Sequence, residues 1–126
     1  AACGWEVKCL GYKPGLRPDI VTSLSREFVR GRAHVVHTHN NVPLIYGAMA
    51  ARLAGGPAVI QTRHGQALGT TRRHRAAVRI ASLLTRRVVC VSDDVRQVSA
   101  AEGIPGRKLM VIRNGIDTTR FAYHGP

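Results

Sequence analysis

Short apolar runs along the chain alternate with longer stretches in which apolar residues recur at helical spacing. The apolar runs predict five strands, at residues 5–10, 34–39, 58–62, 87–92 and 108–113. Most of these runs contain consecutive Val and Ile with little alternation, which is typical of strands buried on both faces of a parallel sheet. The stretches between them predict four helices, at residues 18–30, 43–53, 71–86 and 92–103.

This alternation of strand and helix predicts the fold class. Consecutive strand–helix–strand units with right-handed crossovers build a parallel sheet. We therefore expect an α/β, Rossmann-like, doubly wound parallel sheet of about five strands with helices on both faces. The length of 126 residues fits one domain, residues 1–126, and the sequence contains no internal repeat.

Charge narrows the choice of partners. The formal net charge is +12, from 19 Lys and Arg against 7 Asp and Glu. Aromatic residues are only 5% and none clusters with the arginines, which argues against nucleic acid. The predicted helix at 71–86 carries one apolar face (Ala77, Ile80, Ala81, Leu84) and one basic face (Arg72, Arg75, Arg79, Arg86). The basic face is either a solvated surface or a contact with an anionic membrane.

Localisation follows from cysteine usage and from apolar length. The three cysteines form no C-x-x-C pair, and reduced thiols in a cytoplasmic protein fit this pattern. The apolar stretch at 42–60 is interrupted by Arg52 and by Gly55-Gly56-Pro57, so we expect no transmembrane segment. The expected location is the cytoplasm, with the inner membrane face as the alternative.

Polar residues follow the predicted strands at the end where parallel sheets bind ligands. His39 and Asn40 follow the second strand, Arg63 and His64 the third, and Asn114-Gly115 the fifth. We expect His39 and His64 to line a ligand site. His37 and His39 share one face of a strand, so a metal pair and a hydrogen-bonded core histidine at 37 are further readings, but no third ligand is placed by sequence.

A glycine-rich stretch at 65–69 leads into the helix that begins near residue 71. The anion-binding candidates there are Thr70, Thr71, Arg72 and Arg73. The alternative is an ordinary capped helix with a basic exposed face. Other phosphate and nucleophile motifs, namely G-x-G-x-x-G after a strand, the Walker loop and G-x-S-x-G, are absent from the sequence, which excludes the common dehydrogenase, P-loop and hydrolase patterns.

Four segments taken together resemble the amino-terminal domain of family 4 glycosyltransferases, which are retaining enzymes of GT-B fold. They are HVVHTHN at 34–40, TRHG at 62–65, VVCVS at 88–92, and VIRNGID at 111–117 followed by Arg120-Phe121. The resemblance implies transfer of a sugar from a nucleotide-sugar to a glycan or lipid-linked acceptor, without a cofactor. It assigns His64 as the catalytic candidate that touches the transferred sugar. His39, Asn40 and Arg63 would line the acceptor side, and Asn114-Gly115 would lie near the donor.

The resemblance also implies what this chain lacks. The family's first strand and glycine-rich loop would precede Ala1, and its donor domain would follow Pro126. We therefore expect the isolated chain to be inactive, and its unpaired sheet edges to cause a rearranged sheet or a homodimer. The alternative function is a non-enzymatic, small Rossmann-like module that binds a nucleotide or another anion.

Overall fold

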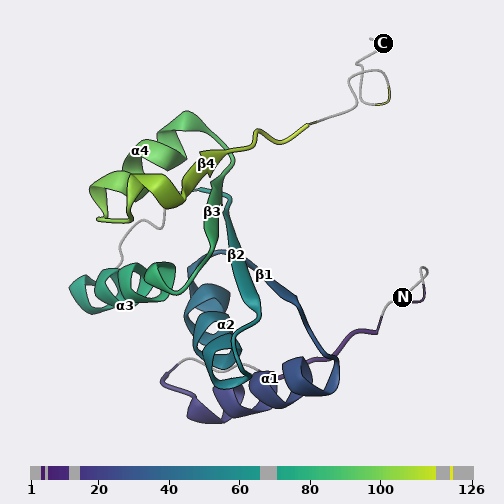
Figure 1. Ribbon diagram of the computed structural model, residues 1–126. Coiled ribbons are helices and arrows are strands. Elements are labelled where there is room, and N and C mark those ends of the chain that lie inside the picture. Colours follow the sequence, from purple (N-terminus) through teal and green to yellow (C-terminus); the bar gives the residue numbers. More distant parts are fainter. Residues whose placement is uncertain (1–3, 5, 12–14, 66–70, 116–119, 121–126) are drawn as a thin grey trace, which may run out of the picture.

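The computed structural model of the protein describes residues 4, 6–11, 15–65, 71–115 and 120. The elements in chain order are α1 (Pro18–Arg30), β1 (Val35–His39), α2 (Asn41–Leu53), β2 (Ala58–Arg63), α3 (Arg72–Leu83), β3 (Arg87–Cys90), α4 (Asp93–Ala101), the 3₁₀ turn η1 (Gly106–Lys108) and β4 (Leu109–Val111). The four strands form one parallel sheet in the order β1-β2-β3-β4 (Figure 1). The predicted α/β class with a parallel sheet is confirmed.

Local signals set the helix ends. The Thr71 hydroxyl accepts a hydrogen bond from the His74 N–H, and the Ser92 hydroxyl accepts one from the Val95 N–H, so both residues are N-caps. Helix α2 begins two residues before the predicted start, because Pro43 fits in a first turn where an N–H has no helical partner. Helix α1 has the predicted bounds.

The predicted strand at 5–10 is wrong for its described residues, since 6–10 form no regular structure. This segment lies against α1, where Lys8 contacts Glu27 and Glu6 pairs with Arg30. A strand exists only where a neighbour completes its hydrogen bonds, and within the described part of the chain β1 pairs with β2 alone. The described sheet consequently has four strands, not five.

The prediction of helices on both faces is also wrong for the described residues. Helices α2, α3 and α4 lie on one side of the sheet, and α1 packs against α2 (Figure 1). Right-handed crossovers that all advance in the order β1-β2-β3-β4 must all pass over the same face. The opposite face is open, and β1 accordingly alternates between exposed and buried residues, with Val35 54% exposed and Val36 8%.

Close packing on the helix side forms the core. Val36, Ala51 and Val59 join β1, α2 and β2 in one buried cluster, against which Phe28 of α1 packs. Helix α2 approaches β1 so closely at Gly47 that a Cβ there would lie 2.7 Å from the Thr38 Cγ2 atom. A residue with a side chain at position 47 would therefore push the helix and the sheet apart.

The basic helix α3 is rotated from its predicted orientation. Ala81 is buried as expected, but Ile80 and Leu84 are 63% and 44% exposed. The residues that α3 buries are instead Val78, Ala81 and Ser82. The exposed side of this helix therefore carries apolar as well as basic residues.

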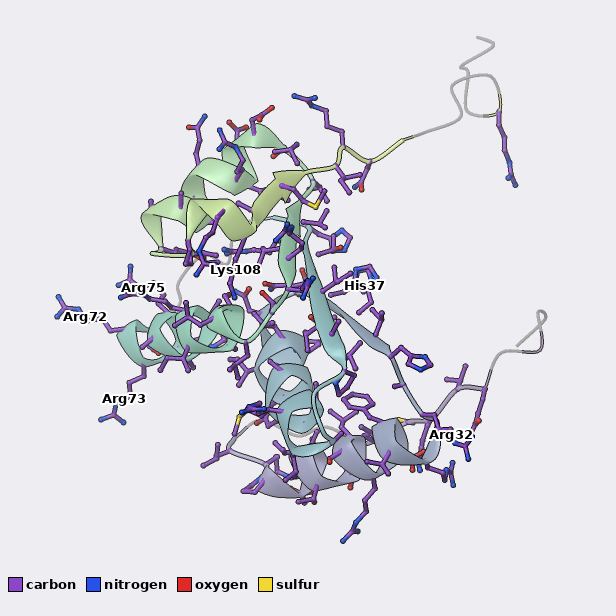
Figure 2. All side chains as sticks on the ribbon, viewed as in Figure 1. Arg32, His37, Arg72, Arg73, Arg75 and Lys108 are labelled. Carbon is purple, nitrogen blue, oxygen red and sulfur yellow. The ribbon has the colours of Figure 1, made fainter. Side chains whose placement is uncertain are left out.

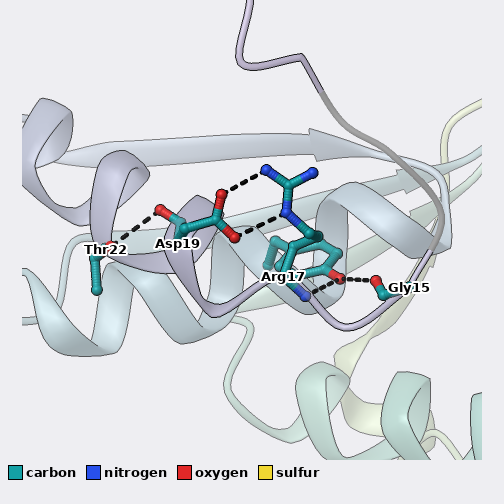
Figure 3. A network of polar contacts seen from close by, with 5 residues as sticks. Gly15, Arg17, Asp19 and Thr22 are labelled. Atoms are coloured by element: carbon teal, nitrogen blue, oxygen red, sulfur yellow. Dashed lines mark hydrogen bonds and ion pairs between the residues drawn. The ribbon is translucent and has the colours of Figure 1, made fainter.

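A polar network ties the start of α1 to α2 (Figure 3). The Tyr46 hydroxyl donates to the Gly15 carbonyl over 2.9 Å and accepts from the Arg17 N–H over 3.3 Å. The Arg17 guanidinium pairs with Asp19, whose carbonyl accepts from the Thr22 hydroxyl. These contacts fix α1 beside α2 although no strand of the described sheet leads into it.

Cys9 is an exposed free thiol and Cys90 a buried one, while Cys3 lies outside the described residues. Within the described part of the chain, no helix has the length and apolar character needed to cross a membrane.

Candidate functional site

The predicted site residues gather at the carboxyl ends of β1 and β2. His39 is the last residue of β1 and pairs in register with Thr62, so the following residues of both strands lie side by side. Consecutive residues of a strand point to opposite faces. The site therefore has two sides, one on the open face of the sheet and one towards the helices.

Three histidines form a chain of contacts on the open face. The His39 Nδ1 lies 2.8 Å from the His64 Nε2, and their rings are stacked with centroids 5.2 Å apart. The ring of His37 is tilted against that of His39 with centroids 4.4 Å apart, and its Nε2 lies 2.8 Å from the Thr62 hydroxyl (Figure 2). His37 is exposed, so it is not the core histidine that the sequence offered as one reading. Among the described residues, no group of three His, Cys, Asp or Glu side chains could hold a metal ion.

This cluster lowers the pKa of His39. The largest cause is the loss of water around its ring, and the charges of protonated His37 and His64 act in the same direction. A hydrogen bond between two imidazoles needs one nitrogen that carries a proton and one that does not. The lowered pKa favours the neutral form of His39, whose Nδ1 can donate to or accept from the His64 Nε2 depending on the tautomer.

A pocket of about 410 Å³ lies where the strand ends meet the helices. It is lined by Asn40, Asn41, Val42, Pro43, Arg63, His64, Gly65 and His74. The structure thus brings together Asn40, Arg63 and His64, three of the predicted site residues. His74, in the first turn of α3, also lines it, and the sequence did not single that residue out.

Arg63 lies in the wall of this pocket and is almost completely buried, with only 2% of its surface exposed. The sequence did not predict this burial. Its Nη1 donates to the Ser99 hydroxyl over 2.8 Å and to the Glu102 carboxylate over 2.7 Å. Both partners belong to α4 or its end. The sequence contains no signal for these contacts, because they depend on α4 packing beside β2 at the level of its last residue.

The backbone at Asn40 is strained. Its φ of 66° with ψ of −178° is a conformation that residues with side chains rarely adopt. Two hydrogen bonds hold it there, since its N–H donates to the Thr62 carbonyl over 3.0 Å and its carbonyl accepts from the side chain of Gln61 over 3.3 Å. Gln61 is completely buried. It fixes the turn from β1 into α2, a role that sequence reasoning missed.

A second depression of about 540 Å³ covers the open face of the sheet. Asn114 lines it together with His37, His39, Thr62 and His64, and the rest of its lining comes from the exposed side of all four strands. Gly115, next along the chain, is exposed. His64 lines both this depression and the pocket beside α2, so it lies between the two.

Three of the four anion-binding candidates lie among the described residues. Thr71 caps α3, and Arg72 and Arg73 are exposed and extend outward from the start of that helix (Figure 2). None of these three lines the pocket beside α2. Thr70 lies outside the described residues.

Comparisons with known proteins identify the family of the chain. Residues 6–120 match the family model described as Glycosyltransferase Family 4. A curated relative from Escherichia coli, UDP-Gal:alpha-D-GlcNAc-diphosphoundecaprenol alpha-1,3-galactosyltransferase, is 33% identical over 107 residues, covering 79% of this chain and 28% of the relative.

A crystal structure of a glycosyltransferase from Rickettsia africae ESF-5 has the same fold, with a TM-score of 0.70 and 19% identity over 94% of this chain and 31% of that one. The chain thus spans less than a third of the length of either protein. Because the family model matches nearly the whole chain, the chain belongs to Glycosyltransferase Family 4.

Proposed function

We propose that this chain is the acceptor-side part of a retaining glycosyltransferase that moves a sugar from a nucleotide-sugar to a glycan or a lipid-linked acceptor. The observation that carries the proposal is the convergence of Asn40, Arg63 and His64 on one pocket from two strand ends. Sugar hydroxyls are recognised by a few convergent polar groups in a concave site. The name of the E. coli relative, a galactosyltransferase acting on a lipid-linked N-acetylglucosamine, supports the substrate class.

His64 takes the central role in this proposal. Sugar transfer breaks the bond between the anomeric carbon and the nucleotide, and forms a bond from the same carbon to an acceptor hydroxyl. A residue that touches the transferred sugar must therefore lie between the donor and acceptor sides, as His64 lies between the two depressions. Its hydrogen bond with His39 fixes the orientation of its ring, which makes His39 a positioning residue as well as part of the acceptor wall.

Asn114 and Gly115 form the donor-facing part of the proposed site. Asn114 lies on the open face with His39 and His64, away from the pocket beside α2. In this arrangement the acceptor enters on the helix side of β2 and the donor approaches across the open face. We expect the isolated chain to bind sugars weakly and to transfer none.

Binding of sugars to the ¹⁵N-labelled chain tests the proposal. We expect UDP-galactose and a methyl glycoside of N-acetylglucosamine each to shift amide signals at the carboxyl ends of β1 and β2. His64→Ala should weaken both interactions about 10-fold, the loss of one or two hydrogen bonds to a ligand. His34→Ala is the matched control, because His34 is an exposed histidine that precedes β1 at the opposite end of the sheet. If neither sugar shifts these signals, or if the two variants behave alike, the proposal is wrong.

We extend the proposal to the location of the protein, at the cytoplasmic face of an anionic membrane. The exposed side of α3 combines positive charge with apolar surface, a composition suited to a lipid interface. Ile80 and Leu83 on it are 63% and 50% exposed. Arg72, Arg73 and Arg75 project from its first half (Figure 2). An acceptor on a lipid carrier would be met at such a surface.

Cosedimentation with vesicles tests this location. Each arginine near an anionic surface contributes roughly 1 kcal/mol, so replacing Arg72, Arg73 and Arg75 by Gln should weaken binding to phosphatidylglycerol vesicles on the order of 100-fold. The matched control removes the same charge from α1 and the turn that follows it, by Arg26→Gln, Arg30→Gln and Arg32→Gln. Equal losses in the two triple variants would show that net charge alone drives binding and would contradict a role for α3.

A further inference from the structure

Arg63 is a buried cation, and some of its N–H groups form no hydrogen bond with the described residues. A guanidinium carries five N–H groups. Among the described residues, Ser99 and Glu102 engage Nη1, while Nε and Nη2 are buried and have no hydrogen-bond partner. Buried donors are rarely left unpaired in folded proteins because the lost hydration is not replaced.

The unpaired donors form one edge of the guanidinium. Nε and Nη2 lie on the same side of the planar group, and their parallel N–H bonds make the fork that binds two oxygens of a carboxylate or a phosphate. Glu102 occupies the other end through Nη1. The ion pair with Glu102 therefore anchors Arg63 and leaves its bidentate edge unused.

The pocket that Arg63 lines is suited to an anion. The 13-residue α2 and the 12-residue α3 both contribute first-turn residues to it, Asn41 and Val42 from one and His74 from the other. Free backbone N–H groups and the positive ends of the helix dipoles lie at such first turns. Helix α2 has no side-chain cap that would occupy its first N–H groups. No acidic residue is among those that line the pocket.

We propose that this pocket binds the phosphate group of the acceptor, with the Nε and Nη2 edge of Arg63 and the first-turn N–H groups of α2 as its donors. The inference rests on the proposed function, since it assumes that the pocket takes the acceptor. It adds that the acceptor is a sugar phosphate or diphosphate rather than a neutral glycan. Nε and Nη2 are shielded from water in this structure, so the proposal requires the Arg63 side chain to turn its free edge towards the pocket when phosphate binds.

The test is titration of the ¹⁵N-labelled 126-residue chain at constant ionic strength with three probes: inorganic pyrophosphate, N-acetylglucosamine 1-phosphate and neutral N-acetylglucosamine. We expect the two phosphates to shift the Arg63 Nε–H signal and the amide signals of Asn41 and Val42. Neutral N-acetylglucosamine should bind at least 10-fold more weakly than its 1-phosphate. Shifts confined to the exposed arginines of α3 would overturn the proposal.

Two variants and one control sharpen the result. Arg63→Gln should weaken binding of pyrophosphate at least 10-fold, while Arg52→Gln, which removes an exposed arginine from the opposite end of α2, should change it less than twofold. Val42→Trp fills the pocket without changing its charge and should also reduce binding at least 10-fold. This second variant keeps the test decisive if Arg63→Gln fails to fold by circular dichroism. Binding unchanged in Val42→Trp would overturn the proposal.

The outcomes separate this inference from the proposed function and from other sources of phosphate. If neutral N-acetylglucosamine binds the pocket as well as the sugar phosphate does, the phosphate site is wrong while the acceptor role stands. If pyrophosphate binds through Arg63 but no sugar binds, the acceptor role is wrong, and with it the assignment of the phosphate to an acceptor. Phosphatidylglycerol vesicles that shift the Arg63 Nε–H signal where the sugar phosphate does not would assign the site to a lipid headgroup and likewise overturn it.

Discussion

Lys108 is a buried lysine that caps the carboxyl end of α3. Its Nζ donates to the carbonyls of Ser82, Leu83 and Thr85 over 3.2, 2.6 and 2.7 Å, reaching across from η1 (Figure 2). Burial lowers the pKa of Lys108, as do the charges of Arg107 and Arg87, and the three carbonyls accept hydrogen bonds from the ammonium. A cation at a helix carboxyl end also interacts favourably with the helix dipole. Replacing Lys108 therefore tests how α3 is held to the β4 end of the sheet.

The magnitude for Lys108→Met follows from the carbonyls that lose their partner. Ser82 keeps hydrogen bonds from the Thr85 hydroxyl and N–H, whereas the described hydrogen bonds give Leu83 and Thr85 no other donor to their carbonyls. The buried Thr85 carbonyl costs about 1–3 kcal/mol when it is left unpaired, the part-buried Leu83 carbonyl costs about 1 kcal/mol because water can reach it, and the methionine returns about 1 kcal/mol by apolar burial. We expect a net loss of about 2 kcal/mol, a substantial part of the ~5–15 kcal/mol that stabilises a typical domain.

Urea unfolding followed by circular dichroism at pH 7 measures this loss. The matched control is Arg107→Met, which changes an exposed cation of the same 3₁₀ turn and should alter stability by less than about 0.5 kcal/mol. If Lys108→Met costs less than about 1 kcal/mol, or no more than the control does, the capping role of Lys108 is refuted.

Three further predictions concern packing, pH and assembly. Gly47→Ala should destabilise the protein by about 1–3 kcal/mol in urea, because the new Cβ meets the Thr38 methyl group, and unchanged stability would show that α2 can move. Because the folded pKa of His39 is lowered, the unfolded chain takes up its proton first, so stability should fall as pH drops below about 6.5, and His39→Asn should flatten this slope in unfolding curves. The unpaired edge of β1 predicts a homodimer at high concentration, and light scattering that shows a folded monomer would contradict it.

Features that depend on residues adjacent along the chain were predictable from the sequence. The bounds of α1, the Ser92 cap of α4 and the strands at 35–39 and 58–63 follow from local apolar pattern and capping chemistry. Residues 6–10 show the limit of such patterns. Their apolar alternation fits a strand, but a strand requires a partner, and the sequence of one segment does not say whether a partner lies beside it.

The order of the strands in the sheet was the main feature that the sequence did not predict. This order places all three crossover helices on one face and leaves the other face uncovered by any described helix. A run such as Val88-Val89-Cys90-Val91 looks buried on both sides by composition. In the structure Val88 and Cys90 are fully buried while Val89 and Val91 are only partly covered, because all three crossover helices pass on one side. Likewise, the predicted rearrangement of the sheet does not occur among the described strands, whose order is sequential.

Arg63 and His64 are adjacent in sequence, but strand geometry gives them different structural roles. Sequence analysis placed both residues in the same cleft, and both line the pocket beside α2, but their side chains make different contacts. Because adjacent strand residues face opposite ways, Arg63 turns to the helices and meets Glu102, whereas His64 turns to the open face and meets His39. The buried ion pair holds the end of β2 against α4, and that anchor fixes where His64 lies. A loss of sugar binding in an Arg63 variant therefore has two physical sources, the phosphate contact and the placement of His64. The Nε–H signal of Arg63 separates them, because only the first requires that signal to respond to phosphate.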